Sequence, residues 1–186
     1  MEFVLHYRGP LRANRGPTEK HALRKHFHVQ LKKLWTQYPL KSFEQMIGPE
    51  RIGQNFWLIK PVRDFRFAPL VTEQLQLVAE LDILLLRPEP PGSLLNQSGD
   101  IDNRIKTLLD ALKIPSEPNA LPKEAHPVAL EEEPLFCLLE DDSLVTHLTI
   151  RTDRLLEPVR EKSEVVALVR VTTRQLRVMV GTIGLA

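Results

Sequence analysis

The sequence predicts an α+β fold: a single domain in which a mixed β-sheet carries two main helices. Strand-like and helix-like segments follow one another in the order strand, helix, strands, helix, strands, which is typical of a sheet covered by helices. The chain has 186 residues, a length that suits one domain with a sizeable core. It contains no glycine-rich phosphate loop, which argues against a doubly wound nucleotide-binding fold.

The strands are predicted where apolar residues alternate with polar ones or form short β-branched runs. Residues 2–8 alternate and form the first strand, and residues 75–88 (LQLVAELDILLLRP) form the longest. Residues 65–71 are a shorter candidate that Pro69 is expected to interrupt. The remaining predicted strands are residues 56–62, the two segments flanking the acidic residues 140–142, and residues 164–173 and 175–183.

Two helices are predicted from apolar residues that recur at helical spacing. The first runs from about Glu19 to Gln37, with Thr18 as its candidate N-cap. Its core-facing residues are Leu23, Phe27, Leu31, Leu34 and Trp35. The second helix covers residues 100–113, where the apolar stripe is Ile101, Ile105, Leu108, Leu109 and Leu112.

Composition indicates a soluble cytoplasmic protein. Cys137 is the single cysteine, so an internal disulfide is excluded and a reducing compartment is expected. The N-terminus lacks the pattern of a signal peptide, and no apolar run is long enough to span a membrane. Net charge is only +1, but residues 1–60 hold eleven Lys or Arg against four acids, whereas residues 114–142 hold eight acids and one lysine. Such a basic segment can steer a polyanion.

The segment GDIDNRIKTLLDAL predicts a divalent-metal site at the start of the second helix. Asp100 and Asp102 are two residues apart at a helix entrance, where the dipole favours anions. Hard cations such as Mg²⁺ prefer carboxylate oxygens, with water and phosphate completing the shell. Lys106 lies one turn after Asp102 and could contact a scissile phosphate. A third carboxylate is expected from Asp141 or Asp142, between two apolar segments.

Each of these residues also has a purely structural interpretation. Asp100 could be a helix N-cap. Asp102 and Lys106, at a spacing of four, could form an ordinary surface ion pair. Asp141 and Asp142 could belong to a polar turn. Residue spacing alone does not decide between these interpretations and a metal site.

Other residues that attract functional interpretations are given mainly structural ones. His21, His26 and His28 lack the spacing of a metal motif, so we expect them on the surface or facing DNA. Asp82 interrupts an apolar strand and is expected on its exposed face. The other assignments are core or edge packing for Trp35 and Trp57, with base stacking as an alternative, and burial for Cys137.

The two motifs together resemble the RusA family of Holliday junction resolvases. That family pairs an aspartate-x-aspartate-asparagine helix and its lysine with a downstream pair of aspartates followed by a strand. Asp100, Asp102, Asn103 and Lys106 match the first motif, and Asp141 and Asp142 match the second. The resemblance covers about a third of the chain, chiefly residues 99–112 and 138–151. Relative to the family, residues 38–74 and 114–135 are expected to be insertions.

The resemblance implies a Mg²⁺-dependent endonuclease, with Mn²⁺ as an alternative cofactor, that acts as a homodimer on four-way or other branched DNA. It implies that Asp100, Asp102 and Asp142 hold the metal and that Lys106 assists catalysis. Basic residues that family members carry just before the first motif are missing here, so Arg12, Arg15 and Lys20 are the candidate DNA contacts. The alternatives are a non-catalytic nucleic-acid-binding module and a protein-interaction domain that uses the acidic residues 114–142.

Overall fold

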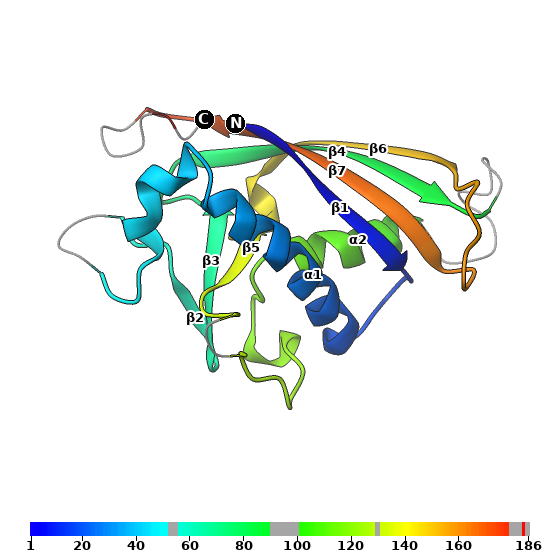
Figure 1. The fold of residues 1–186 in the computed structure, drawn as a ribbon, viewed down its shortest axis with the longest axis horizontal. Helices are drawn as coiled ribbons and strands as arrows, with labels where there is room; N and C mark the ends of the chain where they lie inside the picture. The colour runs from blue at the N-terminus through cyan, green and yellow to red at the C-terminus, as the bar shows by residue number, and fades with distance from the viewer. Residues whose placement is uncertain (52–55, 90–100, 129–130, 179–183, 185–186) are drawn as a thin grey trace.

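The computed structural model describes residues 1–51, 56–89, 101–128, 131–178 and 184, and Figure 1 shows their arrangement. The α+β class is confirmed, but the strands form two mixed sheets instead of the single sheet that the sequence predicts. Within the described residues, no helix is both long and apolar enough to cross a membrane.

The larger sheet has four strands in the order β1-β7-β4-β6. β7 is antiparallel to both of its neighbours, whereas β6 runs parallel to β4. The smaller sheet has the order β2-β3-β5, in which β2 is antiparallel and β5 parallel to β3. The strand bounds are β1 Glu2–Pro10, β2 Lys60–Val62, β3 Phe65–Val71, β4 Leu77–Arg87, β5 Leu135–Leu139, β6 Val145–Arg154 and β7 Glu164–Gln175.

Two α-helices, α1 (Pro17–Trp35) and α2 (Ile101–Leu112), cover one face of the four-stranded sheet (Figure 1). Their apolar stripes pack with the inner residues of the sheet into one core, which joins Phe27 of α1, Leu108 of α2 and Leu81 of β4. Short 3-10 helices occupy Leu40–Ile47 (η1), Pro118–Ala120 (η2) and Asp142–Leu144 (η3). The order of elements follows the sequence prediction through both helices and the strands on either side of the acidic break.

Four local predictions are wrong, each for a physical reason. Thr18 is not the cap, because α1 begins at Pro17 after Gly16, and proline suits the first helical position. Pro69 does not interrupt β3. Proline has no backbone N–H to donate to a neighbouring strand, but β2 pairs only with Phe65–Phe67, so no bond to β2 is required at Pro69. Residues 56–59 form no strand, although Leu58 is buried. Residues 176–178 likewise continue no strand after β7, and residues 179–183 lie outside the described part.

Candidate nucleic-acid site

Asp102 and Lys106 lie on the exposed side of α2, one turn apart. The helix forms because Ile105, Leu108 and Leu112 present one apolar stripe to the core. Neither Asp102 nor Lys106 makes a side-chain hydrogen bond or ion pair with another described residue. The alternative of an ordinary surface ion pair between them is therefore wrong, and both charges face solvent.

Asp142 lies at the other end of α2. Its Oδ2 is 2.7 Å from Nζ of Lys113, the residue that follows the helix. Eleven residues separate Asp102 from Lys113, which corresponds to about 16 Å of helix rise. The described residues therefore do not bring Asp102 and Asp142 together in one chain. Asp100 lies outside the described residues.

The strand register of the larger sheet also separates Asp102 from Asp142. β6 starts opposite Ala79, near the beginning of β4, and Asp142 lies just before it. The start of α2 lies near the opposite end of β4, where Glu89 forms a 3.3 Å ion pair with Arg104. No group of three His, Cys, Asp or Glu side chains in the described part of the chain is arranged to hold a metal ion.

Asp141 has the structural role that the polar-turn interpretation predicts. Its Oδ1 accepts a 2.9 Å hydrogen bond from the backbone N–H of Ser143 and so caps η3. Hydrogen bonds from Ser143 are the main cause that lowers the pKa of Asp141. The carboxylate is therefore engaged within its own turn.

The candidate DNA contacts divide into two groups. Arg12 and Arg15 remain on the surface loop before α1, where Arg12 pairs with Glu161 and Arg15 lies 3.2 Å from Glu19. Lys20 instead connects the helices, because its Nζ is 2.6 Å from Oδ2 of Asp110 and both side chains are largely buried. Its place indicates a structural ion pair and not a DNA contact.

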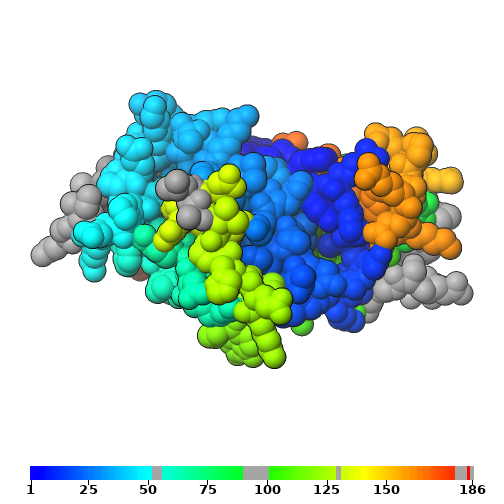
Figure 2. Space-filling view, turned by 60° about the horizontal axis from the view of Figure 1, so that its bottom comes forward, coloured from blue at the N-terminus to red at the C-terminus, as the bar shows by residue number. Residues whose placement is uncertain are grey.

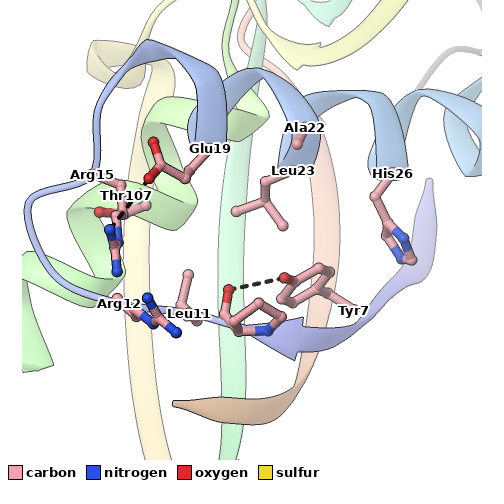
Figure 3. Close-up of a pocket in the computed structure, with 10 residues that line it drawn as sticks. Tyr7, Leu11, Arg12, Arg15, Glu19, Ala22, Leu23, His26 and Thr107 are labelled. Carbon is pink, nitrogen blue, oxygen red and sulfur yellow. Dashed lines mark hydrogen bonds and ion pairs between the residues drawn. The ribbon is translucent and has the colours of Figure 1, made fainter. Parts of the chain in front are cut away.

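A cavity of about 330 Å³ connects the arginine loop with α2 (Figure 3). Arg12 and Arg15 line one end, together with Thr107, the residue that follows Lys106. In the space-filling view the N-terminal segment (dark blue) lies beside the segment around residue 160 (orange), to which Arg12 is bonded (Figure 2). The loop thus contacts the segment around residue 160 and shares the cavity with Thr107, in the middle of α2.

Some acidic residues of the segment 114–142 pair with basic residues of the same chain. Lys25 of α1 pairs with Glu132, which is only 5% exposed, and Lys60 Nζ is 2.7 Å from Glu140. Other acids of the segment, among them Glu117, Glu124 and Glu131, are exposed. The alternative of a protein-interaction domain that uses the acidic residues 114–142 therefore stays a prediction.

The prediction that all three histidines lie on the surface is wrong for two of them. His21 and His28 are 6% and 4% exposed, whereas His26 is exposed. Burial is the main cause that lowers the pKa of His21 to about 4 and that lowers the pKa of His28. The His21 ring meets Phe65 of β3 edge to face with centroids 5.1 Å apart, and His28 lies against β5, where Phe136 N–H donates to its Nδ1 at 2.9 Å.

The other structural assignments are confirmed. Cys137 is buried, and burial raises the pKa of its thiol to about 12, which excludes a reactive thiolate at neutral pH. Asp82 lies on the outer face of β4, with Oδ2 2.9 Å from Arg151. Trp35 is in the core, and Nε1 of the half-buried Trp57 donates to the Gly48 carbonyl at 3.0 Å.

Sequence reasoning missed Arg24, which is 2% exposed and connects the two helices. Its guanidinium donates to the carbonyls of Asp110 and Lys113 at 2.8 and 3.1 Å, at the C-terminal end of α2. The sequence does contain a signal for the burial of Arg24. Residues 21, 24, 28, 31 and 35 recur at helical spacing and therefore share one face of the helix, and the last two of them are apolar.

No protein-family model matches the chain, and comparisons with curated proteins and with solved structures found no match. The resemblance to RusA resolvases therefore depends on the two short motifs alone.

Proposed function

We propose that the chain is a divalent-metal-dependent endonuclease that cuts branched DNA, and that it acts as a homodimer. The observation that carries the proposal is the pair of Asp102 and Lys106, which are exposed on α2 and make no side-chain bond with another described residue. A carboxylate and an ammonium that are one turn apart and not neutralised by each other suit a reacting phosphate. Thr107, the residue after Lys106, lines a cavity together with Arg12 and Arg15, and these arginines supply positive charge that attracts phosphate.

The two edges of the four-stranded sheet support the homodimer. At the β1 edge, Gln30 and His26 of α1 form hydrogen bonds of 2.7 to 2.9 Å with the backbone of His6. This cover prevents another strand from pairing there. Among the described residues, no side chain covers the outward edge of β6 in this way.

The side chains of β6 add an apolar surface to this open edge. Leu148 and Ile150 are 41% and 39% exposed, although they share a face with the fully buried Leu81 and Ile83 of β4. A long apolar edge strand is a template for pairing with another strand. We infer that β6 pairs antiparallel with β6 of a second copy, in the symmetric arrangement usual for homodimers.

Such a dimer would bring together the carboxylates that are expected to hold the metal. In an antiparallel pair, the start of one β6 lies beside the end of the other, and α2 begins near the end of β6. Asp142 of the partner subunit would then approach the end of the molecule that carries Asp102. Asp100 and Asp102 with the partner's Asp142 are the residues proposed to hold Mg²⁺ or Mn²⁺, which can activate water and neutralise phosphate charge.

Incubation of the protein with a synthetic four-way junction, with Mg²⁺ or with EDTA, tests the enzymatic proposal. We expect nicks only with Mg²⁺, and Asp102→Asn should abolish them while junction binding stays within about twofold, because one exposed carboxylate contributes little to affinity. The matched control is Asp64→Asn, an exposed aspartate in the turn between β2 and β3, away from β6 and α2. Folded protein that leaves four-way, three-way and flap DNA intact would disprove the nuclease.

Mixing two inactive variants tests the shared site. If Asp102→Asn and Asp142→Asn chains are refolded together in equal amounts, about half of the dimers contain one chain of each kind. Each mixed dimer has one intact site and one site that has lost both carboxylates. About a quarter of wild-type nicking should therefore return. A site formed within one chain gives no recovery, because every chain carries a damaged site. No recovery from mixed dimers, verified by differential tagging, would contradict the shared arrangement.

The second candidate function is a nucleic-acid-binding module without catalysis. It is favoured by the ion pair between Asp142 and Lys113, which engages the carboxylate away from Asp102. This candidate predicts salt-dependent DNA binding and no heat of Mg²⁺ or Mn²⁺ binding above that of the Asp102→Asn variant. Titration calorimetry with each metal separates the two functions.

A further inference from the structure

The cavity between the N-terminal loop and the helices has two chemically different ends (Figure 3). Arg12, Arg15 and Thr107 lie at one end, and Tyr7 and His26 lie at the other. Its volume, about 330 Å³, is at the small end of the range for ligand sites. The space therefore suits a group of the size of one ring system and excludes a duplex.

The end of the cavity at Tyr7 and His26 is built from aromatic and apolar side chains. The rings of Tyr7 and His26 meet edge to face with centroids 5.1 Å apart, and Leu23, which is 5% exposed, lies beside them (Figure 3). Tyr7 donates a 3.0 Å hydrogen bond to the Pro10 carbonyl, which fixes its ring. Gly9 is required for this position, because a Cβ there would lie 2.6 Å from the Tyr7 oxygen. This end offers a fixed surface for a flat ring.

The end of the cavity at Arg12 and Arg15 keeps guanidinium donors available. Arg12 uses Nε for Ser163 and Nη2 for Glu161, and Arg15 uses Nη1 for Glu19. Among the described residues, nothing bonds to Nη1 of Arg12 or to Nε and Nη2 of Arg15. Planar guanidinium groups bind phosphate oxygens through paired N–H donors. A ligand with a flat ring and an attached phosphate fits both ends.

We propose that this cavity binds one unstacked nucleobase, with its adjoining phosphate held by Arg12 and Arg15. The inference rests on the proposed function and specifies it, because a base can enter only from single-stranded or branched DNA, where it is already free of its stack. The same chemistry is present in a free nucleotide. The base contacts the aromatic end, and the phosphate lies at the end lined by Arg12, Arg15 and Thr107.

The test uses the fluorescent base 2-aminopurine, either within a single-stranded oligonucleotide or as the free deoxynucleoside monophosphate. With wild-type protein, we expect the oligonucleotide fluorescence to change on binding. Ala22→Trp should fill the cavity from an exposed position and weaken binding about fivefold or more, the effect typical of losing one stacked base. Arg12→Ala with Arg15→Ala should weaken binding of both probes.

The matched controls lie outside the cavity. Val29→Trp adds the same indole to α1 two turns later, at a residue that is 66% exposed, and Lys33→Ala with Lys41→Ala removes two exposed positive charges elsewhere. Both should bind the oligonucleotide within about twofold of wild type. Binding of the monophosphate alone would identify a free nucleotide as the ligand and support the same cavity chemistry.

Two outcomes overturn the inference. One is binding of either probe that Ala22→Trp leaves unchanged, and the other is no binding of either probe. Nicking of the four-way junction, measured on the same preparations, reports separately on the proposed function. A protein that nicks junctions but shows either outcome retains the nuclease function and loses the base site.

Discussion

At the scale of single residues, burial decides which charged and titratable side chains are available to a ligand. Asp102 and Lys106 are exposed and pair with no other described residue, whereas Lys20, Arg24 and His28 are held in the packing between elements. The sequence alone suggested the same surface role for most of these residues. Their neighbours in space, which come from α2 and the segment 131–136, separate the two groups.

The buried histidine His21 predicts a loss of stability in acid. Its folded-state pKa, about 4, lies below the ordinary value of 6.5, so the unfolded chain takes up a proton first as pH falls. Its contribution is present above pH 6.5 and is lost as pH falls toward 4. We expect the free energy of unfolding, measured with urea, to fall in this window. His21→Gln should flatten that fall by about 1–2 kcal/mol.

The control for this prediction is His6, whose side chain is exposed on β1. His6→Gln should leave the pH profile of the free energy of unfolding close to that of the wild type, because the substitution changes little of the packing. His28, whose pKa is lowered mainly by burial, should add to the fall in the same direction. A His21→Gln profile that is parallel to wild type from pH 7 to 4 would show that this ring is not the acid-sensitive group.

At the scale of elements, Arg24 predicts how strongly α1 and α2 depend on each other. It supplies the donors for two carbonyls at the C-terminal end of α2, which no further turn of that helix can satisfy. Arg24→Met keeps the length of the side chain but removes these donors. The free energy of unfolding should fall by about 1–3 kcal/mol, the cost of buried unsatisfied carbonyls.

Lys33→Met is the comparison, since Lys33 is exposed on the same helix and should change stability by about 0.5 kcal/mol or less. Arg24→Lys should recover only part of the loss, because a single ammonium lacks the planar fork that reaches both carbonyls. Equal stability of Arg24→Met and Lys33→Met would mean that the link between the helices contributes little.

The element scale also shows what the sequence could predict. Apolar periodicity locates α1, α2 and β4 closely, because each buries a regular stripe. Residues 56–59 and 176–178 are apolar enough for strands, but whether a strand forms depends on a neighbour at the right distance. The two-sheet arrangement depends on such long-range pairing, so the sequence could not specify it.

The candidate site was only partly predictable, because one part of it depends on local helical spacing and another part on long-range strand pairing. The spacing of Asp102 and Lys106 fixes their shared face once a helix forms, and that face is exposed. The place of Asp142 depends on where β6 enters the sheet, opposite the beginning of β4. No local pattern encodes that register, so convergence with Asp102 could not be tested from the sequence.

At the scale of the whole molecule, the two edges of the large sheet differ in a way that affects function. α1 covers the β1 edge, but along β6 the core side of the sheet extends beyond the helices and leaves Leu148 and Ile150 about 40% exposed. Exposure of these two side chains to water is unfavourable, and burying them would remove no polar side-chain group from water. The proposed shared active site needs this same edge to be the contact between two copies.

Leu148→Lys with Ile150→Lys should therefore separate the dimer and stop cleavage together. Charges placed on an edge strand oppose pairing with another strand, and a lone chain keeps Asp102 at the opposite end of α2 from Asp142. Sedimentation velocity at about 20 µM should show the variant at half the mass of wild type, with nicking reduced about 100-fold or more, while circular dichroism shows that the separated chain remains folded. The control is Val4→Lys, 51% exposed on the covered β1 edge, which should leave mass and nicking unaltered. Wild-type protein that sediments as a monomer and still nicks junctions would refute the dimeric site, because one chain would then suffice for cleavage.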